Sequence, residues 1–182
     1  MKSKSTSFDV EKFIAETSFN VVGVDEVGRG CIAGPVCAGV VFFGDHSLDF
    51  SRYVDSKTIR EEIREQLAKE ISDKHFSAIG WATVEEIDQI NIRQASLLAM
   101  KRALIQLFQN ISHQYELKNF IALVDGKDTV PNFDLCLQQS VIKGDQRVRQ
   151  ISAASIIAKV ARDQYMKKMS DPWKIKSSPT EI

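Results

Sequence analysis

Two short apolar runs that end in acidic residues place the strongest constraint on the fold. Asn20–Val24 is a β-branched run that is followed directly by Asp25 and Glu26. Phe120–Val124 is almost continuously apolar and is followed by Asp125. Runs of this length and composition predict buried β-strands. Because burying a charge is costly, carboxylates in such places are usually paired, hydrogen-bonded or bound to a cation.

Turn residues and apolar periodicity predict the other elements. Strands are expected over 35–43, 76–83 and 140–142, and helices over 8–17, 58–72, 91–111 and 151–169. The Gly-rich turn Gly28–Gly34 indicates that the first two strands are antiparallel neighbours. This order favours an α/β fold in which a mixed sheet is flanked by helices.

The predicted helices have recognisable faces. Asp55 and Ser56 are expected to cap the helix over 58–72. The buried stripe of that helix is expected to be Ile59, Ile63, Leu67 and Ile71. The buried residues of 91–111 are expected to be Ala95, Leu98, Ala99, Ala103, Ile105 and Leu107. Small residues would let the helix over 151–169 lie close to the sheet: Ser152, Ala153, Ala154, Ser155 and Ala158.

Composition excludes several classes of protein. A chain of 182 residues, 43 % of them apolar, is expected to form one domain. Its formal net charge of zero argues against a global basic field that binds nucleic acid, although local Lys and Arg clusters remain available. The cysteines form no C-x-x-C pair and the histidines are scattered, so reduced thiols are expected. No apolar stretch reaches ~20 residues and no secretory signal is recognised, so a cytoplasmic protein is expected.

Four carboxylates are candidate ligands of a divalent cation: Asp25, Glu26, Asp125 and Asp163. If they converge, their oxygens form the hard ligand set that Mg²⁺ or Mn²⁺ uses in sites that cut phosphodiesters. Asp163 follows Lys159 by one helical turn, so an ordinary i,i+4 ion pair is the alternative for it. A solvated strand end is the alternative for Asp25 and Glu26, and a turn is the alternative for Asp125.

A glycine turn and several basic residues are candidate phosphate contacts. Gly28, Arg29 and Gly30 can present N–H groups and a guanidinium to an anion. The spacing from Gly23 to Gly28 imitates a P-loop, but Arg-Gly follows instead of Lys and Ser or Thr, so an NTP site is excluded. Other candidates, each equally consistent with a solvated surface residue, are Lys57, Lys143, Arg147 and Lys159.

Several blocks in one order resemble bacterial ribonuclease HII over roughly residues 20–169. They are Val24–Gly30 with Ala33–Val36, Asp55–Lys57, Ile87–Ile92, Leu123–Gly126, Ile142–Asp145 and Ala153–Asp163. No single block is specific, whereas the ordered series is.

The resemblance implies a ribonuclease H-like fold with a mixed five-stranded sheet. It also implies an endonuclease that hydrolyses the RNA strand of RNA–DNA hybrids, including single ribonucleotides in duplex DNA, and leaves 5′-phosphate and 3′-hydroxyl ends by two-metal catalysis. By motif position, the ligands of Mg²⁺ or Mn²⁺ would be Asp25, Glu26, Asp125 and Asp163. The Gly28–Gly30 turn would contact the backbone and sense the 2′-hydroxyl at the cut.

The expected organisation is an N-terminal extension or short helix over 1–19, a catalytic domain over 20–169 and a weakly ordered tail over 170–182. A monomer that binds nucleic acid and no membrane is expected. The family's C-terminal block, whose Tyr recognises the ribonucleotide, has no counterpart after Tyr165–Met169. A catalytically weakened hybrid-binding protein is therefore the alternative function, and a junction resolvase on the same fold is a third interpretation.

Overall fold

The centre of the molecule is a five-stranded sheet in the order β3-β2-β1-β4-β5. The computed structural model describes residues 9–31, 33–44, 50–54 and 56–170. The strands are β1 (Asn20–Val27), β2 (Val36–Phe42), β3 (Phe76–Ala82), β4 (Phe120–Asp125) and β5 (Leu137–Val141). β1 pairs antiparallel with β2, and β2 with β3, whereas the pairs β1–β4 and β4–β5 are parallel. The predicted mixed sheet and the antiparallel first pair are confirmed.

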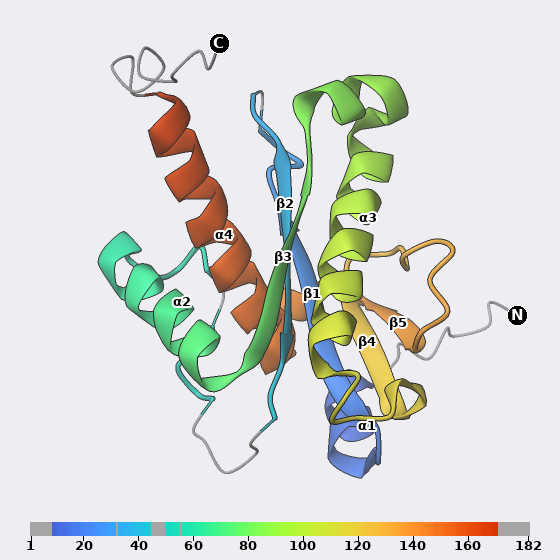
Figure 1. Cartoon of the computed structure of the whole chain (residues 1–182). Coiled ribbons are helices and arrows are strands. Elements are labelled where there is room, and N and C mark those ends of the chain that lie inside the picture. Colours follow the sequence, from blue (N-terminus) through green and yellow to red (C-terminus); the bar gives the residue numbers. More distant parts are fainter. Residues whose placement is uncertain (1–8, 32, 45–49, 55, 171–182) are drawn as a thin grey trace, which may run out of the picture.

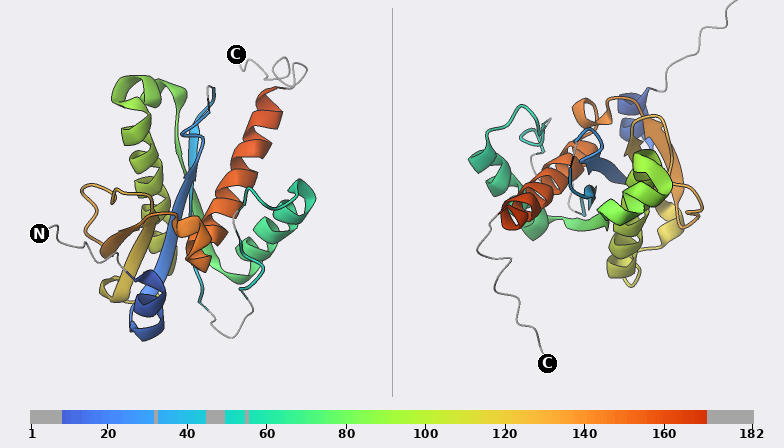
Figure 2. Two further views of the ribbon diagram at one scale, coloured as in Figure 1. Left: turned by 180° about the vertical axis from the view of Figure 1, so that it is seen from behind. Right: turned by 90° about the horizontal axis from the view of Figure 1, so that it is seen from above.

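Helices cover both faces of this sheet (Figure 1). They are α1 (Val10–Glu16), α2 (Glu61–Lys74), α3 (Val84–Ile111) and α4 (Arg149–Met169), with short 3-10 helices η1 (Leu117–Asn119) and η2 (Gly144–Gln146). The view from above in Figure 2 shows α3 on one side of the sheet and α4 with α2 on the other. The sheet is therefore the middle of three layers, the α/β architecture predicted from the sequence.

Alternation along β1 directs its side chains into two separate cores. Val22 and Val24 join the cluster beneath α3. Val21 faces the opposite side, where it clusters with Ile151 of α4. Because side chains alternate with a period of two, Asp25 shares the face of Val21 and is directed toward α4.

Close approach of the helices depends on glycines in the strands. A Cβ on Gly39 of β2 would lie 2.3 Å from the carbonyl oxygen of Ala154 in α4. A Cβ on Gly80 of β3 would lie 2.1 Å from the carbonyl oxygen of Ala99 in α3. No side chain fits at such distances, so both helices rest on strand backbone. The expected close packing of the small-residue helix on the sheet is confirmed.

The helix predicted over 58–72 begins later than expected. α2 starts at Glu61, and the residue before it makes no capping side-chain hydrogen bond. Ser56 does not cap this helix, because its hydroxyl lies 2.9 Å from that of Ser155 in α4. Asp55, the other predicted cap, lies outside the described residues. The prediction that Ser56 caps this helix was therefore wrong, because its hydroxyl bonds to a distant part of the chain instead.

The helix predicted over 91–111 begins earlier than expected. Thr83 and Glu86 form a reciprocal capping box at the start of α3. Asn91 lies inside α3 with a φ of 67° and a ψ of 161°, so the helical path is kinked there. The predicted start coincides with this kink, since the periodic apolar pattern is regular only after it.

Four predicted stripe positions are less buried than expected. Ile63 is 46 % exposed, and Ile59 is half-buried and lies before the start of α2. Leu98 and Ile105 are half-buried, and their neighbours Leu97 and Leu104 are buried instead. The stripe predicted over 58–72 repeats every four residues, and such a repeat drifts around a helix of 3.6 residues per turn by about 40° at each step, so it does not track one face.

The remaining predicted elements are present with small shifts. The helix over 8–17 is α1, whose first turn is capped by the side chain of Asp9. The strand over 140–142 is β5, which begins three residues earlier. Residues 1–8 of the predicted N-terminal extension and 171–182 of the predicted tail lie outside the described residues. Within the described residues, no helix is long and apolar enough to cross a bilayer.

Adding one methyl group at Gly39 tests the close packing of α4. Gly39→Ala should lower the free energy of unfolding by about 3 kcal/mol, because overpacking forces the backbone of α4 away from β2. Gly30→Ala is the matched control, since a Cβ there would have no neighbour within 4 Å. Urea unfolding followed by circular dichroism measures both. Equal stability of the two variants would contradict the packing described.

Candidate active site

Asp25 and Asp125 lie side by side at the ends of two neighbouring strands. β1 and β4 pair in parallel through Val24 and Val124, and each aspartate is the next residue along its strand. Both valines belong to the core beneath α3, so both aspartates are directed to the α4 face. Neighbouring strands are about 4.8 Å apart, so the sheet itself brings these two carboxylates together.

Asp25 is a buried acid with several hydrogen-bond donors. It is 5 % exposed. Its Oδ1 accepts the N–H of Glu26 at 2.8 Å, and the hydroxyl of Ser155 donates to the same carboxylate. Burial raises the pKa of Asp25 well above its usual range, and the charges of Glu26 and Asp125 raise it further. Without a cation, this site therefore favours the protonated form of Asp25.

Glu26 belongs to the same group of interacting charges. Burial raises the pKa of Glu26 to about 7, against the lowering effect of Arg29. The guanidinium of Arg29 lies 4.0 Å from the Glu26 carboxylate. The charge of Asp125 again acts to raise the Glu26 pKa.

Asp125 lies beside a second acidic residue, Asp145 of η2. The Asp125 Oδ1 accepts the N–H of Gly144 at 2.6 Å. Burial raises the pKa of Asp125, the Gly144 hydrogen bond lowers it, and the charge of Asp145 raises it. Asp145 is itself only 6 % exposed, and Lys57 Nζ lies 3.6 Å from its carboxylate. Asp145 is therefore a member of the acidic group.

Asp25, Glu26 and Asp125 line a cavity of about 310 Å³. Its acidic wall is formed by Asp25, Glu26 and Asp125, and its cations are Arg29, Lys57 and Lys159. The other lining residues are Val27, Gly28, Gly30, Cys31, Ser56 and Ser155. An anionic polymer could therefore meet both positive charge and an acidic centre in one place.

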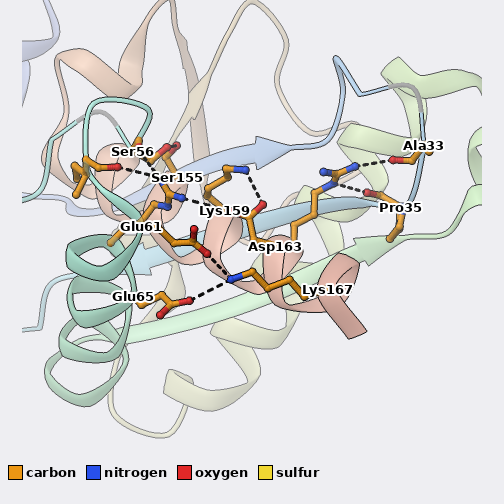
Figure 3. Close-up of polar contacts among 12 residues, drawn as sticks. Ala33, Pro35, Ser56, Glu61, Glu65, Ser155, Lys159, Asp163 and Lys167 are labelled. Atoms are coloured by element: carbon orange, nitrogen blue, oxygen red, sulfur yellow. Dashed lines mark hydrogen bonds and ion pairs between the residues drawn. The ribbon is translucent and has the colours of Figure 1, made fainter. Parts of the chain in front are cut away.

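A buried arginine of α4 holds the glycine turn that lines this cavity. Arg162 is 5 % exposed; its guanidinium donates to the carbonyls of Pro35 at 3.0 Å and Ala33 at 2.8 Å. Figure 3 shows these contacts beside those of Lys159 and Asp163. Gly28 adopts a φ of +111°, and a Cβ there would lie 2.6 Å from the Arg162 Nε. The turn therefore needs both the glycine and the arginine.

Two of the candidates predicted from the sequence lie elsewhere. Asp163 does not line the cavity; its carboxylate contacts Lys159 Nζ at 2.6 Å and the Arg64 guanidinium at 3.5 Å. Asp163 lies two helical turns beyond Ser155, about 12 Å along α4. Lys143 is exposed, with a φ of 55°, and does not line the cavity either. The structure thus brings together Asp25, Glu26 and Asp125 and leaves Asp163 apart from them.

The sequence held signals for the residues that were missed. Asp145 stands in the Ile142–Asp145 block, immediately after a predicted strand that ends beside Asp125. Ser155 and Arg162 are in the Ala153–Asp163 block. Ser155 was expected to be only a small packing residue, and no role was expected for Arg162. Side-chain hydrogen bonds to residues more than a hundred positions away leave no periodic pattern.

The donor set fits a hard divalent cation. Carboxylate oxygens are the ligands that Mg²⁺ and Mn²⁺ prefer. Burial raises the pKa of Asp25, Glu26 and Asp125, and neighbouring carboxylates raise each pKa further. A bound cation would offset both effects. In the described part of the chain, no group of three acidic, His or Cys side chains lies close enough together to hold an ion.

Comparison with known proteins gives one consistent family. Residues 22–177 match the family model described as Ribonuclease HII. A curated relative of the same description from Pelagibacter ubique (strain HTCC1062) is 45 % identical over 150 residues, which cover 82 % of this chain and 75 % of the relative.

Solved structures agree with this family. The ribonuclease HII of Archaeoglobus fulgidus, solved in complex with PCNA, superposes with a TM-score of 0.65 and 25 % identity over 85 % of this chain and 78 % of that one. Bst-RNase HIII, solved in complex with Mn²⁺, has a TM-score of 0.67 and 18 % identity over 85 % of this chain and 55 % of that one, and it supports the fold alone.

The raised acid pKa values predict how stability depends on pH. Between the ordinary pKa of a carboxylate, about 4, and the Glu26 value of about 7, the folded state holds more protons than the unfolded one. The free energy of unfolding must therefore fall as pH rises through this window. The melting temperature of the metal-free protein should fall between pH 5.5 and pH 8, and Asp25→Asn should make the fall smaller, with the part that comes from Glu26 remaining.

Addition of Mn²⁺ should raise the wild-type melting temperature at pH 8 and have little effect at pH 5.5, because the cation competes with protons. Asp134→Asn, at an exposed position, is the control and should keep the wild-type pH dependence. Differential scanning calorimetry measures all of these. The same pH dependence in Asp25→Asn as in the wild type would contradict the assignment of a buried, repelled charge.

Proposed function

The chain belongs to the ribonuclease HII family, the metal-dependent endoribonucleases of the ribonuclease H type, and from that premise we propose that it hydrolyses the RNA strand of RNA–DNA hybrids. The observation that supports this most is the pair of Asp25 and Asp125 at the ends of parallel strands, facing a cavity with cationic walls. We extend the proposal to single ribonucleotides in duplex DNA. The enzyme would act as a monomer in the cytoplasm.

We assign the divalent ions to Asp25, Glu26 and Asp125, with Asp145 rather than Asp163 as the fourth carboxylate. Asp145 is supported by its burial and by the effect of its charge on Asp125. The Asp163 carboxylate already forms ion pairs with Lys159 and Arg64. These two positive charges would repel a metal ion bound at Asp163. The ion is Mg²⁺ or Mn²⁺; Bst-RNase HIII was solved with Mn²⁺.

Bound divalent ions would supply an activated water and stabilise the departing 3′ oxygen, which gives 5′-phosphate and 3′-hydroxyl ends. The protein's own residues position the substrate. Arg29, which is about half exposed at the cavity wall, would contact the phosphate beside the cut. The amides of Gly28 and Gly30 would approach the sugar, where the 2′-hydroxyl distinguishes RNA from DNA.

The lysines would bind phosphates farther along the strand. Lys57 and Lys159 line the cavity, and Lys143 is exposed close to Asp145 in the chain. Such contacts determine register and affinity rather than sequence preference. No side-chain nucleophile is required, so neither the exposed Cys31 nor a serine is assigned a covalent role.

Replacement of Asp125 tests the catalytic assignment. Asp125→Asn keeps the side-chain shape and the Gly144 hydrogen bond but removes a charge that would hold the ion. The turnover number should fall by at least about 100-fold, since even the outer partners of metal ligands contribute 10–100-fold. Asp73→Asn, at an exposed position on α2, is the control. Near-normal turnover by Asp125→Asn would overturn the assignment.

The substrates for this assay are three matched duplexes: all-DNA, DNA with one ribonucleotide, and RNA–DNA hybrid, each with Mg²⁺ and with Mn²⁺. The wild type should nick the last two and leave the first intact. Binding without nicking in either ion would favour the hybrid-binding alternative. Cutting of a branched all-DNA substrate would favour a junction resolvase.

Asp145→Asn distinguishes the two candidates for the fourth carboxylate. We expect it to weaken Mn²⁺ binding and to reduce turnover by about tenfold or more, as expected for loss of one anionic ligand. Isothermal titration calorimetry with Mn²⁺ and steady-state kinetics on the hybrid measure the two effects. Unchanged Mn²⁺ affinity in Asp145→Asn would exclude this residue.

A further inference from the structure

We propose that Asp163 is a positioning residue, which holds the ammonium of Lys159 at the cavity and, through Arg64, fixes the loop that supplies Lys57. The inference rests on the proposed function, because Lys57 and Lys159 are taken to bind substrate phosphates. It assigns Asp163 a role in substrate binding rather than in holding a cation.

The contacts of Asp163 support the first half of this proposal. One carboxylate oxygen contacts Lys159 Nζ at 2.6 Å, and the other lies 3.5 Å from the Arg64 guanidinium. Lys159 lines the cavity and Asp163 does not. The two residues are one helical turn apart on α4, and Figure 3 shows the Asp163 carboxylate directed toward the Lys159 ammonium.

Arg64 connects this pair to the loop before α2. Its guanidinium donates to the carbonyl oxygens of Ser56 and Ile59, each at 3.0 Å. The side chain of Arg64 is only 11 % exposed. A nearly buried arginine with two carbonyl partners and one carboxylate is strongly held, since all three contacts involve a charged donor.

Ser56 and Lys57, two residues of the loop held by Arg64, contact the site. The hydroxyl of Ser56 lies 2.9 Å from that of Ser155, which donates to Asp25. Lys57 Nζ lies 3.6 Å from the carboxylate of Asp145. One carboxylate, that of Asp163, is therefore linked to two lysines on different elements, Lys159 directly and Lys57 through Arg64.

A second ion pair between α2 and α4 serves as a comparison, because it has no contact with the site. Glu61 of α2 pairs with Lys167 of α4 and joins the same two helices, but neither residue lines the cavity. If Asp163 is removed, Lys159 and Arg64 are left as like charges with no shared anion. A free lysine samples many rotamers, so its phosphate contact should weaken.

The test compares Asp163→Asn, Asp163→Glu, Lys159→Gln and the double variant Asp163→Asn/Lys159→Gln on the RNA–DNA hybrid. Asp163→Asn should raise KM roughly tenfold and change kcat by less than about threefold, because the lost contact is equally strong in the ground and transition states. Asp163→Glu should recover part of the loss. The double variant should raise KM by clearly less than the product of the two single effects, since the Lys159 contact is shared and only the route through Arg64 remains to be lost.

Glu61→Gln is the matched control, because it removes an ion pair between the same helices and should leave KM unchanged. Two outcomes would overturn the proposal. One is a fall of kcat by about 100-fold together with loss of Mn²⁺ binding in Asp163→Asn, which would make Asp163 a metal ligand. The other is additive effects of Asp163→Asn and Lys159→Gln on KM.

A second measurement does not depend on the proposed function. Acetylation of lysines by an activated ester, followed by peptide mass spectrometry, reports how accessible each neutral amine is, and an amine held in an ion pair with a carboxylate reacts slowly. Asp163→Asn should accelerate acetylation of Lys159 several-fold and leave the rates at Lys12 and Lys118 unchanged. An unchanged rate at Lys159 would overturn the proposal even if the chain cuts hybrids. Failure of the wild type to cut hybrids, with the rate raised, would overturn only the proposed function.

Discussion

The burial of one charge, that of Asp25, is the constraint on which the rest of the site depends. β1 and β4 run parallel, so the aspartates that follow Val24 and Val124 must lie next to each other on one face. α4 covers that face and excludes water from Asp25. A buried carboxylate beside other carboxylates is stable only when protonated or bound to a cation. The arrangement therefore lowers the free energy of unfolding of the metal-free protein, and a bound cation would restore it.

Successive turns of α4 supply the side chains that surround Asp25 and its cavity. Ser155 donates to Asp25 and contacts Ser56. Lys159 brings an ammonium to the cavity wall, and Arg162 holds the glycine turn through two carbonyl oxygens. These roles require α4 to lie against strand backbone, and a side chain at Gly23 of β1 or Gly39 of β2 would prevent that contact. Packing and function therefore depend on the same contact between helix and sheet.

The strands and the order of the elements could be predicted, because buried strands leave apolar runs. Asp25 and Asp125 were expected to meet only as part of a four-carboxylate cluster, and the parallel pairing of β1 with β4 that places them together was not predicted. The start of α2 could not be predicted, because Ser56 bonds to Ser155 rather than to the local helix. For Asp163, helical spacing indicated the neighbouring Lys159, as the structure has it, but local spacing could not reveal the distant Arg64. The turn that places Asp145 beside Asp125 is also long-range, since it depends on where β5 docks on β4.

The most direct test of the central claim is anomalous scattering from crystals of the protein soaked in Mn²⁺. A bound ion should give an anomalous peak on the α4 face between β1 and β4, about 2.0–2.6 Å from carboxylate oxygens of both Asp25 and Asp125, the usual range for such ligands. A peak on the carboxylate of Asp163, or a well-occupied Mn²⁺ site elsewhere with none at Asp25, would contradict the claim.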